Sequence, residues 1–203
     1  MEATFLQRHP IIKDGFGLLI FILCVLIGTL LINTFVFRSF NVVGPSMEST
    51  LHTGERLIVN RLPVTWAQLR NVDYMPKRGE IIVFKNPQFS AGTGDEYIVK
   101  RVIAFPGERV TVKNGVMTVY NSDHPSGFEP DSAQANQPGN QPGSPTSGNT
   151  DVTVTDGTLF VSGDHREGDY SFDSRNGLGL IPFYDVIGPV EIRLFPFNKI
   201  RTF

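Results

Sequence analysis

Residues 15–37 carry no charged side chain and are bounded by Asp14 and Arg38. As an α-helix this stretch would be roughly 34 Å long, enough to cross a hydrocarbon core of about 30 Å. A cleavable signal peptide is the alternative, but its apolar region would be shorter and a small-residue cleavage site would follow it. The sequence RSFN follows here at 38–41. The pattern therefore favours a retained transmembrane anchor, and the remaining chain would be held at a membrane surface.

The length of the chain allows one domain after this anchor. The sequence predicts a short cytoplasmic tail at 1–14, the anchor at 15–37 and a single domain at 38–203, a length for which one hydrophobic core is usual. Two basic residues, Arg8 and Lys13, precede the apolar segment, and one follows it. This small difference favours a cytoplasmic N-terminus.

Charge and cysteine content exclude several kinds of site. The chain has 18 basic and 20 acidic residues, a balance that gives no reason to expect a nucleic-acid partner. Its single cysteine, Cys24, lies in the apolar segment, so an intrachain disulfide is excluded and the rest of the chain has no thiol nucleophile. The four histidines are scattered without metal-ligand spacing, and we expect neither a metal nor another cofactor.

A lysine lies inside an apolar segment with the composition of a strand, YIVKRVI at 97–103. Because strand side chains alternate between faces, Lys100 and Arg101 lie on opposite faces, each among aliphatic side chains. Burial lowers the pKa of a lysine and makes its neutral amine available as a general base. Arginine keeps its proton, so Lys100 is the candidate base and Arg101 a candidate ion-pair partner. The alternative is a lysine at a sheet edge whose amine reaches water.

Ser46 follows Gly44 and Pro45 shortly after the apolar segment. A serine hydroxyl is a weak nucleophile until a base removes its proton, and Ser-Lys pairs are a known variant of serine-based catalysis. Ser46 and Lys100 together suggest a hydrolase that works at a membrane surface. A serine after Gly-Pro is also a common turn residue, so the alternative is a structural role for Ser46.

Five ordered segments of the sequence resemble the type I signal peptidases. They are GPSMESTL at 44–51, GERLIV at 54–59, RGEIIVFK at 78–85, YIVKRVIAFPGE at 97–108, and GDHR at 163–166 with SFDSR at 171–175. The resemblance runs from the apolar segment to about Ile187. It implies a mainly β, antiparallel β-sheet catalytic domain behind one N-terminal transmembrane helix. It also implies that Ser46 is the nucleophile and Lys100 the general base, as in the bacterial and organellar branch.

The same resemblance assigns supporting roles to five further residues. Ser171 matches a serine whose hydroxyl orients the lysine amine. Asp164 and Asp173 match aspartates that form structural ion pairs, with Arg101 and Arg175 as their expected partners. These pairs are expected to support the site.

The sequence departs from the family pattern in three places, one of which is Ser49, where proline is usual before the Thr-Leu pair. Gly44 stands where some members carry a serine that helps to bind the oxyanion. The backbone N–H of Ser46 would then hold the oxyanion, and one missing donor can cost about 3 kcal/mol of transition-state stabilisation. The last segment holds two extra residues, near Glu167 and Gly168, and has His165 where asparagine is usual.

Short runs rich in valine, isoleucine and phenylalanine predict a mainly β domain. The expected strands are 56–60, 80–85, 96–104, 109–113, 116–120, 158–162 and 186–195. Asn114 and Gly115 lie between two of these runs and predict a type I′ hairpin. Residues 122–150 are rich in Pro, Gly, Ser, Asn and Gln, with Phe128 as the only large apolar residue. They predict a flexible insertion between strands, with a partner-binding loop as the alternative.

Three aromatic residues, Trp66, Phe195 and Phe197, have two possible environments. Aromatic side chains near strand ends usually pack in the core. Aromatic side chains also favour the membrane interface, and this domain is expected to lie beside it. Both interpretations stay open at this point.

The sequence thus predicts a membrane-anchored serine endopeptidase that removes N-terminal signal peptides from exported preproteins. Its substrates would carry small residues before the scissile bond, and the lipid bilayer would be a second partner. The expected location is the plasma membrane, crossed once, with the catalytic domain on the extracytoplasmic side. Two alternatives stay open: a specialised relative that processes one secretion or conjugation partner, and a non-catalytic anchored β-domain that binds exported chains.

Overall fold

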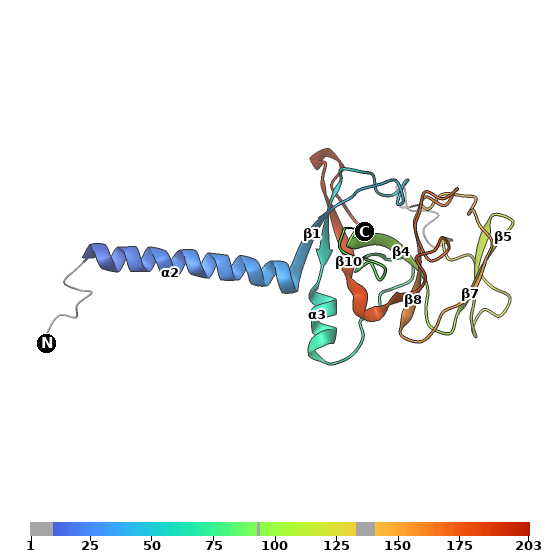
Figure 1. Cartoon of the computed structure of the whole chain (residues 1–203), viewed down its shortest axis with the longest axis horizontal. Helices are drawn as coiled ribbons and strands as arrows, with labels where there is room; N and C mark the ends of the chain where they lie inside the picture. Colours follow the sequence, from blue (N-terminus) through green and yellow to red (C-terminus); the bar gives the residue numbers. More distant parts are fainter. Residues whose placement is uncertain (1–9, 93, 133–140) are drawn as a thin grey trace.

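The computed structural model describes residues 10–92, 94–132 and 141–203. It contains a long N-terminal helix followed by a domain built mainly from antiparallel strands, and the expected fold class is confirmed. Figure 1 shows the helix extending away from this domain. The first nine residues of the expected tail lie outside the described residues.

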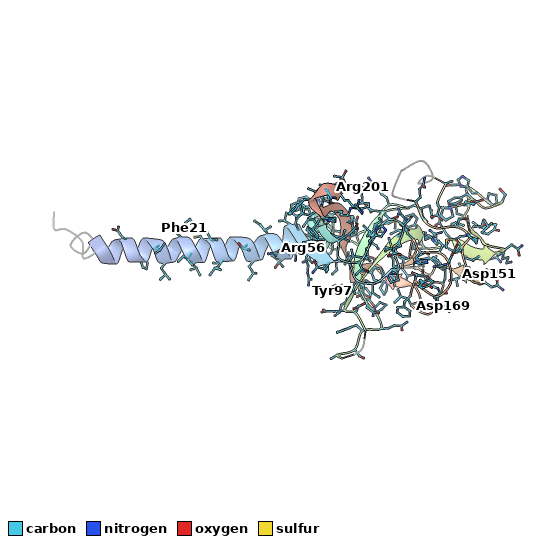
Figure 2. All side chains as sticks on the ribbon, turned by 90° about the horizontal axis from the view of Figure 1, so that it is seen from above. Phe21, Arg56, Tyr97, Asp151, Asp169 and Arg201 are labelled. Carbon is cyan, nitrogen blue, oxygen red and sulfur yellow. The ribbon has the colours of Figure 1, made fainter. Side chains whose placement is uncertain are left out.

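The N-terminal helix has two parts. Helix α2 (Pro10–Leu31) continues as a π-helical turn, η1 (Ile32–Val36). In the part of the chain that the structure describes, Asp14–Val36 is the one helical stretch long and apolar enough to cross a membrane, with a mean hydropathy of 2.8. Figure 2 shows Phe21 pointing outward from this helix. The membrane helix was expected to include Phe37. The helix ends at Val36 instead, and Phe37 has an extended backbone and is the first residue of a strand.

The larger sheet has eight antiparallel strands in the order β1-β2-β10-β3-β4-β8-β9, with β11 paired to β10. Their bounds are β1 (Phe37–Asn41), β2 (Arg56–Asn60), β3 (Ile81–Lys85), β4 (Tyr97–Ala104), β8 (Thr158–Ser162), β9 (Ile181–Pro182), β10 (Val186–Phe195) and β11 (Arg201–Thr202). Strand β4 lies between β3 and β8. Lys100 is therefore on an interior strand, and the sheet-edge alternative for this lysine is wrong.

A smaller sheet contains the predicted hairpin. Its strands are β5 (Arg109–Lys113), β6 (Val116–Tyr120) and β7 (Thr150–Thr153), in the order β6-β5-β7. Asn114 and Gly115 have φ angles of 53° and 82°, and a type I′ turn requires positive φ at both positions. The hairpin is confirmed.

Strand β4 contributes to each of the three clusters that form the core. Val102 belongs to the first, Val99 packs against the second, and Ile103 belongs to the third. Lys100 and Arg101 lie between these apolar residues and are themselves buried. The two cations therefore need either partners or a changed protonation state.

The described flanks of the 122–150 insertion contact the domain. Phe128 packs against the core cluster of the smaller sheet. On the other flank, Gly143 N donates a hydrogen bond to Asp164 O at 2.7 Å. Residues 133–140 lie outside the described residues, and the flexibility of the insertion stays a prediction.

A short helix that the sequence analysis did not predict, α3 (Leu62–Leu69), lies against the end of the N-terminal helix. Asn60 Oδ1 accepts a hydrogen bond from Leu62 N at 3.0 Å and satisfies one of the free donors at the start of α3. Thr65 Oγ1 donates to Phe35 O at 2.9 Å. These contacts fix α3 beside the point where the apolar helix ends.

The three aromatic side chains with open environments are not in the core. Trp66, on α3, is 57% exposed. Phe195 and Phe197 are also exposed and contact one another edge to face at 5.6 Å between ring centroids. Core packing is therefore wrong for all three.

Candidate active site

Ser46 lies in a turn whose neighbours are fixed by burial. Met47 and Leu51, which follow Ser46, are fully buried in the second core cluster. Leu51 N donates to Met47 O at 2.8 Å, and Glu48 N donates to Pro45 O at 3.0 Å. The turn therefore holds Ser46, which is half-buried, between anchored residues.

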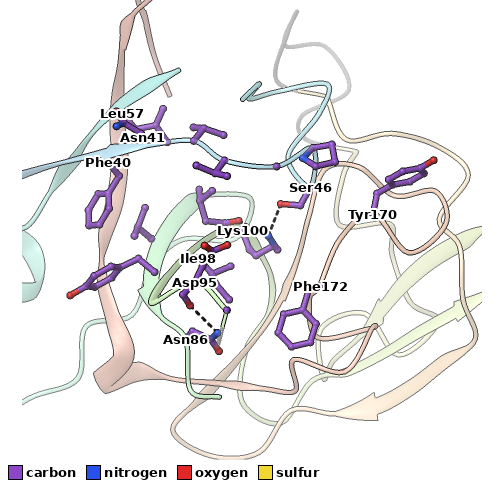
Figure 3. A pocket seen from close by; sticks show the side chains of 18 residues that line it. Phe40, Asn41, Ser46, Leu57, Asn86, Asp95, Ile98, Lys100, Tyr170 and Phe172 are labelled. Carbon is purple, nitrogen blue, oxygen red and sulfur yellow. Dashed lines mark hydrogen bonds between the residues drawn. The ribbon is translucent and has the colours of Figure 1, made fainter. Parts of the chain in front are cut away.

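Lys100, on strand β4, contacts the side chain of Ser46. Lys100 Nζ donates a hydrogen bond to Ser46 Oγ at 2.8 Å and a second one to Val99 O at 2.8 Å (Figure 3). The lysine is only 3% exposed. Burial lowers the pKa of Lys100 to about 8 and outweighs the carboxylates of Asp173 and Asp164, which raise it. The structure thus places an amine of reduced basicity within hydrogen-bonding distance of an alcohol; we call these two residues the Ser-Lys pair.

Arg101, the neighbour of Lys100, has a carboxylate partner. Its Nε donates to Asp164 Oδ1 at 2.7 Å, and a second guanidinium nitrogen donates to Asp164 Oδ2 at 2.5 Å. Thr50 Oγ1 donates to the same carboxylate at 2.5 Å, and Arg101 also donates to Gly79 O at 2.7 Å. Among the described residues, by contrast, none forms an ion pair with Lys100.

Asp173 is the acceptor at the centre of the last segment. It accepts from Gly163 N at 2.9 Å, from Ser171 Oγ at 2.7 Å and from Arg175 at 2.7 Å. Burial alone would raise the pKa of Asp173, but the hydrogen bonds and charge of Arg175 hold this pKa below its ordinary value. The structure thus brings together both expected pairs, Arg101 with Asp164 and Arg175 with Asp173.

Ser171 is placed differently from the expectation. Its hydroxyl donates to Asp173 and forms no hydrogen bond with Lys100. The physical reason is that a buried carboxylate two residues away is the stronger acceptor for a hydroxyl proton. An orienting effect of Ser171 on Lys100 stays a prediction.

Backbone contacts hold the last segment against the turn of the nucleophile candidate. His165 N donates to Ser46 O at 3.1 Å, and His165 Nδ1 lies 3.2 Å from Pro45 O. A side chain at Gly163 would collide with Ser171 Oγ and Ser46 O, so only glycine allows this close approach. Gly44 has a φ of 86°, a conformation that also favours glycine.

A pocket of about 370 Å³ opens beside the Ser-Lys pair. Figure 3 shows Phe40 and Leu57 on one side of the pair, and Tyr170 and Phe172 on the other. The sequence analysis named no residue of this pocket. The exposed Tyr170 and Phe172 alternate with buried Ser171, and this alternation within a loop gives no signal of a pocket before the fold is known. The described residues contain no cluster of carboxylates, histidines and cysteine that could hold a metal ion.

Comparisons with known proteins identify the family of this chain. The model of the family described as signal peptidase, peptidase S26, matches residues 14–195. Signal peptidase I of Bacillus licheniformis is 36% identical over 184 residues, which cover 89% of this chain and 88% of the relative. Signal peptidase I T of Bacillus subtilis (strain 168) is 35% identical over 175 residues, which cover 85% of this chain and 81% of the relative.

A solved structure, signal peptidase I of Enterococcus faecalis, is 27% identical with a TM-score of 0.38, and the match covers 57% of this chain and 96% of that one. The family model and the two Bacillus relatives cover most of the chain. The chain therefore belongs to the signal peptidase I family of hydrolases, peptidase S26.

Proposed function

We propose that this chain is a membrane-anchored serine endopeptidase that removes N-terminal signal peptides from exported preproteins, with Ser46 as nucleophile and Lys100 as general base. The observation that carries the proposal is the 2.8 Å distance between Lys100 Nζ and Ser46 Oγ. A general base must lie within hydrogen-bonding distance of the proton that it removes, and its pKa must lie near the working pH. The lowered pKa of Lys100, about 8, meets the second condition.

In the acylation step, neutral Lys100 Nζ accepts the proton of Ser46 Oγ while Oγ attacks the carbonyl carbon before the scissile bond. The carbonyl oxygen becomes an oxyanion, held mainly by the backbone N–H of Ser46 because Gly44 offers no hydroxyl. The carbon–nitrogen bond then breaks, and the leaving amine takes the proton from Lys100 Nζ. Ser46 now carries the acyl group as an ester, and Lys100 is neutral again.

In the deacylation step, Lys100 Nζ accepts a proton from water while the water oxygen attacks the ester carbon. The bond to Ser46 Oγ breaks, and the proton on Lys100 returns to Oγ. The acid product leaves, and both side chains regain their starting protonation states. The Arg101–Asp164 and Arg175–Asp173 pairs act as scaffolding, because each fixes a segment that contacts the turn of Ser46 or the strand of Lys100.

The position of the site supports cleavage at a membrane surface. Helix Asp14–Val36 would span the plasma membrane once, with the β-domain on the extracytoplasmic side. From Phe37 to Ser46 the chain reaches at most about 30 Å, so Ser46 stays near the bilayer. A signal peptide leaves its apolar helix in the bilayer and presents its scissile bond just outside, which concentrates and orients the substrate at the enzyme.

Cleavage of a synthetic preprotein by the full chain in lipid vesicles tests the proposal. The parent and the control Lys113→Ala, at an exposed lysine on β5, should release the signal peptide. Ser46→Ala and Lys100→Ala should release none. Binding of the preprotein without cleavage by any of the four would instead favour a non-catalytic anchored β-domain. A panel of preproteins then separates general processing from a specialised relative that accepts one secretion or conjugation partner.

A further inference from the structure

We propose that Tyr170 and Phe172 form a subsite for the first residues of the exported chain, those that follow the scissile bond. This inference rests on the proposed function and adds a second substrate-contacting surface to it. The subsite would bind polypeptide through two aromatic faces and favour apolar over small or charged side chains at these positions.

The first observation is the exposure of two aromatic side chains at the pocket. Tyr170 is 61% exposed and Phe172 is 43% exposed, whereas Ser171 between them is fully buried. The chain alternates here, so Ser171 faces the interior while Tyr170 and Phe172 are exposed and line the pocket beside the Ser-Lys pair. A polypeptide that crosses the pair would cover both rings and remove their apolar surface from water.

The second observation is that Tyr170 is fixed relative to the nucleophile. The ring of Tyr170 stacks on His165, with centroids 4.4 Å apart and planes inclined by 20°. His165 is in turn held to the nucleophile turn through its hydrogen bond to Ser46 O at 3.1 Å. A preorganised ring loses little freedom when a ligand binds to it, which favours a binding role.

The third observation concerns the direction in which the substrate chain would cross the Ser-Lys pair. Phe40 lies on β1, which follows directly from the membrane helix, and Figure 3 shows Tyr170 and Phe172 on the opposite side of the Ser-Lys pair. Figure 2 shows Asp169, the residue before Tyr170, further from the helix than Tyr97.

The direction follows from where the signal helix lies. Residues before the scissile bond arrive from the bilayer and reach the side near β1. Residues after the bond then leave past Tyr170 and Phe172, away from the membrane.

The test compares two substrates with the same residues before the scissile carbonyl. One continues for four residues, with leucine at the first two positions after the bond. The other is a methyl thioester, whose small leaving group does not reach the rings. Both require the Ser-Lys pair, so the ratio of their kcat/KM values isolates binding beyond the scissile bond.

The ratio is the kcat/KM of the extended substrate divided by that of the thioester, measured with the full chain in lipid vesicles. Relative to the parent, this ratio should fall about tenfold in Tyr170→Ala and should also fall in Phe172→Ala. Tyr170→Phe keeps the ring and should keep the parental ratio. The matched control is Tyr184→Ala, an 81% exposed tyrosine outside the pocket, and it should also keep the ratio.

Unchanged ratios in both alanine variants would overturn the subsite and leave the proposed function standing. A parent that cleaves neither substrate would overturn the proposed function and the subsite with it. Replacement of the two leucines by glycine should lower the parental ratio, and an equal ratio for both peptides would contradict the predicted preference for apolar side chains.

Discussion

Lys100 and Arg101 are adjacent on β4 and both are buried, but only Arg101 is paired with a carboxylate. An arginine cannot lose its proton, so its burial requires the partner that Asp164 provides. A lysine can lose its proton, and burial lowers the pKa of Lys100 to about 8. The same strand therefore holds one permanent cation and one amine that can become neutral near physiological pH.

Replacement of Lys100 by methionine should stabilise the protein while abolishing cleavage. The pKa of Lys100 falls from 10.5 to about 8 on folding. The folded site disfavours the charged amine. The lowered pKa therefore reduces the free energy of unfolding at every pH at which the lysine of the unfolded chain is charged. The cost is full below pH 8 and disappears above about pH 10.5. Lys100→Met should raise the free energy of unfolding at pH 7 by up to about 3 kcal/mol, measured by urea unfolding in detergent micelles. A variant no more stable than the parent at pH 7 would argue against a costly buried amine.

Replacement of Asp164 by asparagine should destabilise the domain strongly. The substitution removes the charge that neutralises buried Arg101, and breaking such a pair costs about 3 to 5 kcal/mol. The matched control is Asp151→Asn, which breaks the exposed Arg109–Asp151 pair and should leave the unfolding midpoint unchanged. Equal midpoints for the two variants would contradict the structural importance of the buried pair.

Replacement of Ser171 by alanine separates two roles for this residue. Its hydroxyl donates to Asp173, so Ser171→Ala should lower the free energy of unfolding by about 1 to 2 kcal/mol. The pH at which kcat/KM reaches half its maximum should stay the same, because Lys100 loses no hydrogen bond. A shift of this midpoint would show instead that Ser171 orients the lysine amine.

Trp66 should lie at the lipid surface, because α3 contacts the end of the membrane helix and leaves this side chain exposed. Trp66 is the only tryptophan of the chain, so its fluorescence reports this position alone. Phospholipids brominated near the headgroup should quench this fluorescence. The double variant Trp66→Phe with Asp151→Trp is the control, because Figure 2 shows Asp151 at the end of the domain far from the helix. Equal quenching of both proteins, or quenching of neither, would contradict membrane contact at α3.

Local patterns predicted much of the β structure. The expected strands at 56–60, 158–162 and 186–195 coincide with β2, β8 and β10. Each is a short apolar run bounded by glycine or proline, and this signal is contained within the segment itself. The pairing of β10 with both β2 and β3 was not predicted, because it joins segments far apart in the sequence.

Several elements were not predicted, and for two of them, β1 and α3, the reason can be identified. Phe37 is apolar and was counted with the membrane segment, whereas its extended conformation depends on pairing with Asn60 in β2. Helix α3 is only eight residues long and contains a proline near its start. Two start signals were available: Asn60, whose side chain hydrogen bonds to the first residue of the helix, and the proline in its first turn.

The candidate site was predicted from chemistry and resemblance rather than from spacing. Ser46 and Lys100 are far apart in the sequence, and only the fold brings their side chains together. The partner of Ser171 could not be predicted, because a hydroxyl can accept from an amine or donate to a carboxylate, and only the fold shows that Asp173 lies within reach. Tyr170 lies in a loop, and its place in the pocket depends on the contact between His165 and the turn of Ser46.

The dependence of kcat/KM on pH tests the central claim most directly, with a synthetic preprotein and the full chain in lipid vesicles. A protonated Lys100 cannot accept a proton, so kcat/KM should fall about tenfold per pH unit below pH 8 and become constant above it. Lys100→Arg, which keeps the charge but cannot act as a base, should cleave at no pH. A flat profile between pH 6 and about 9, or cleavage by Lys100→Arg, would contradict catalysis by a neutral Lys100.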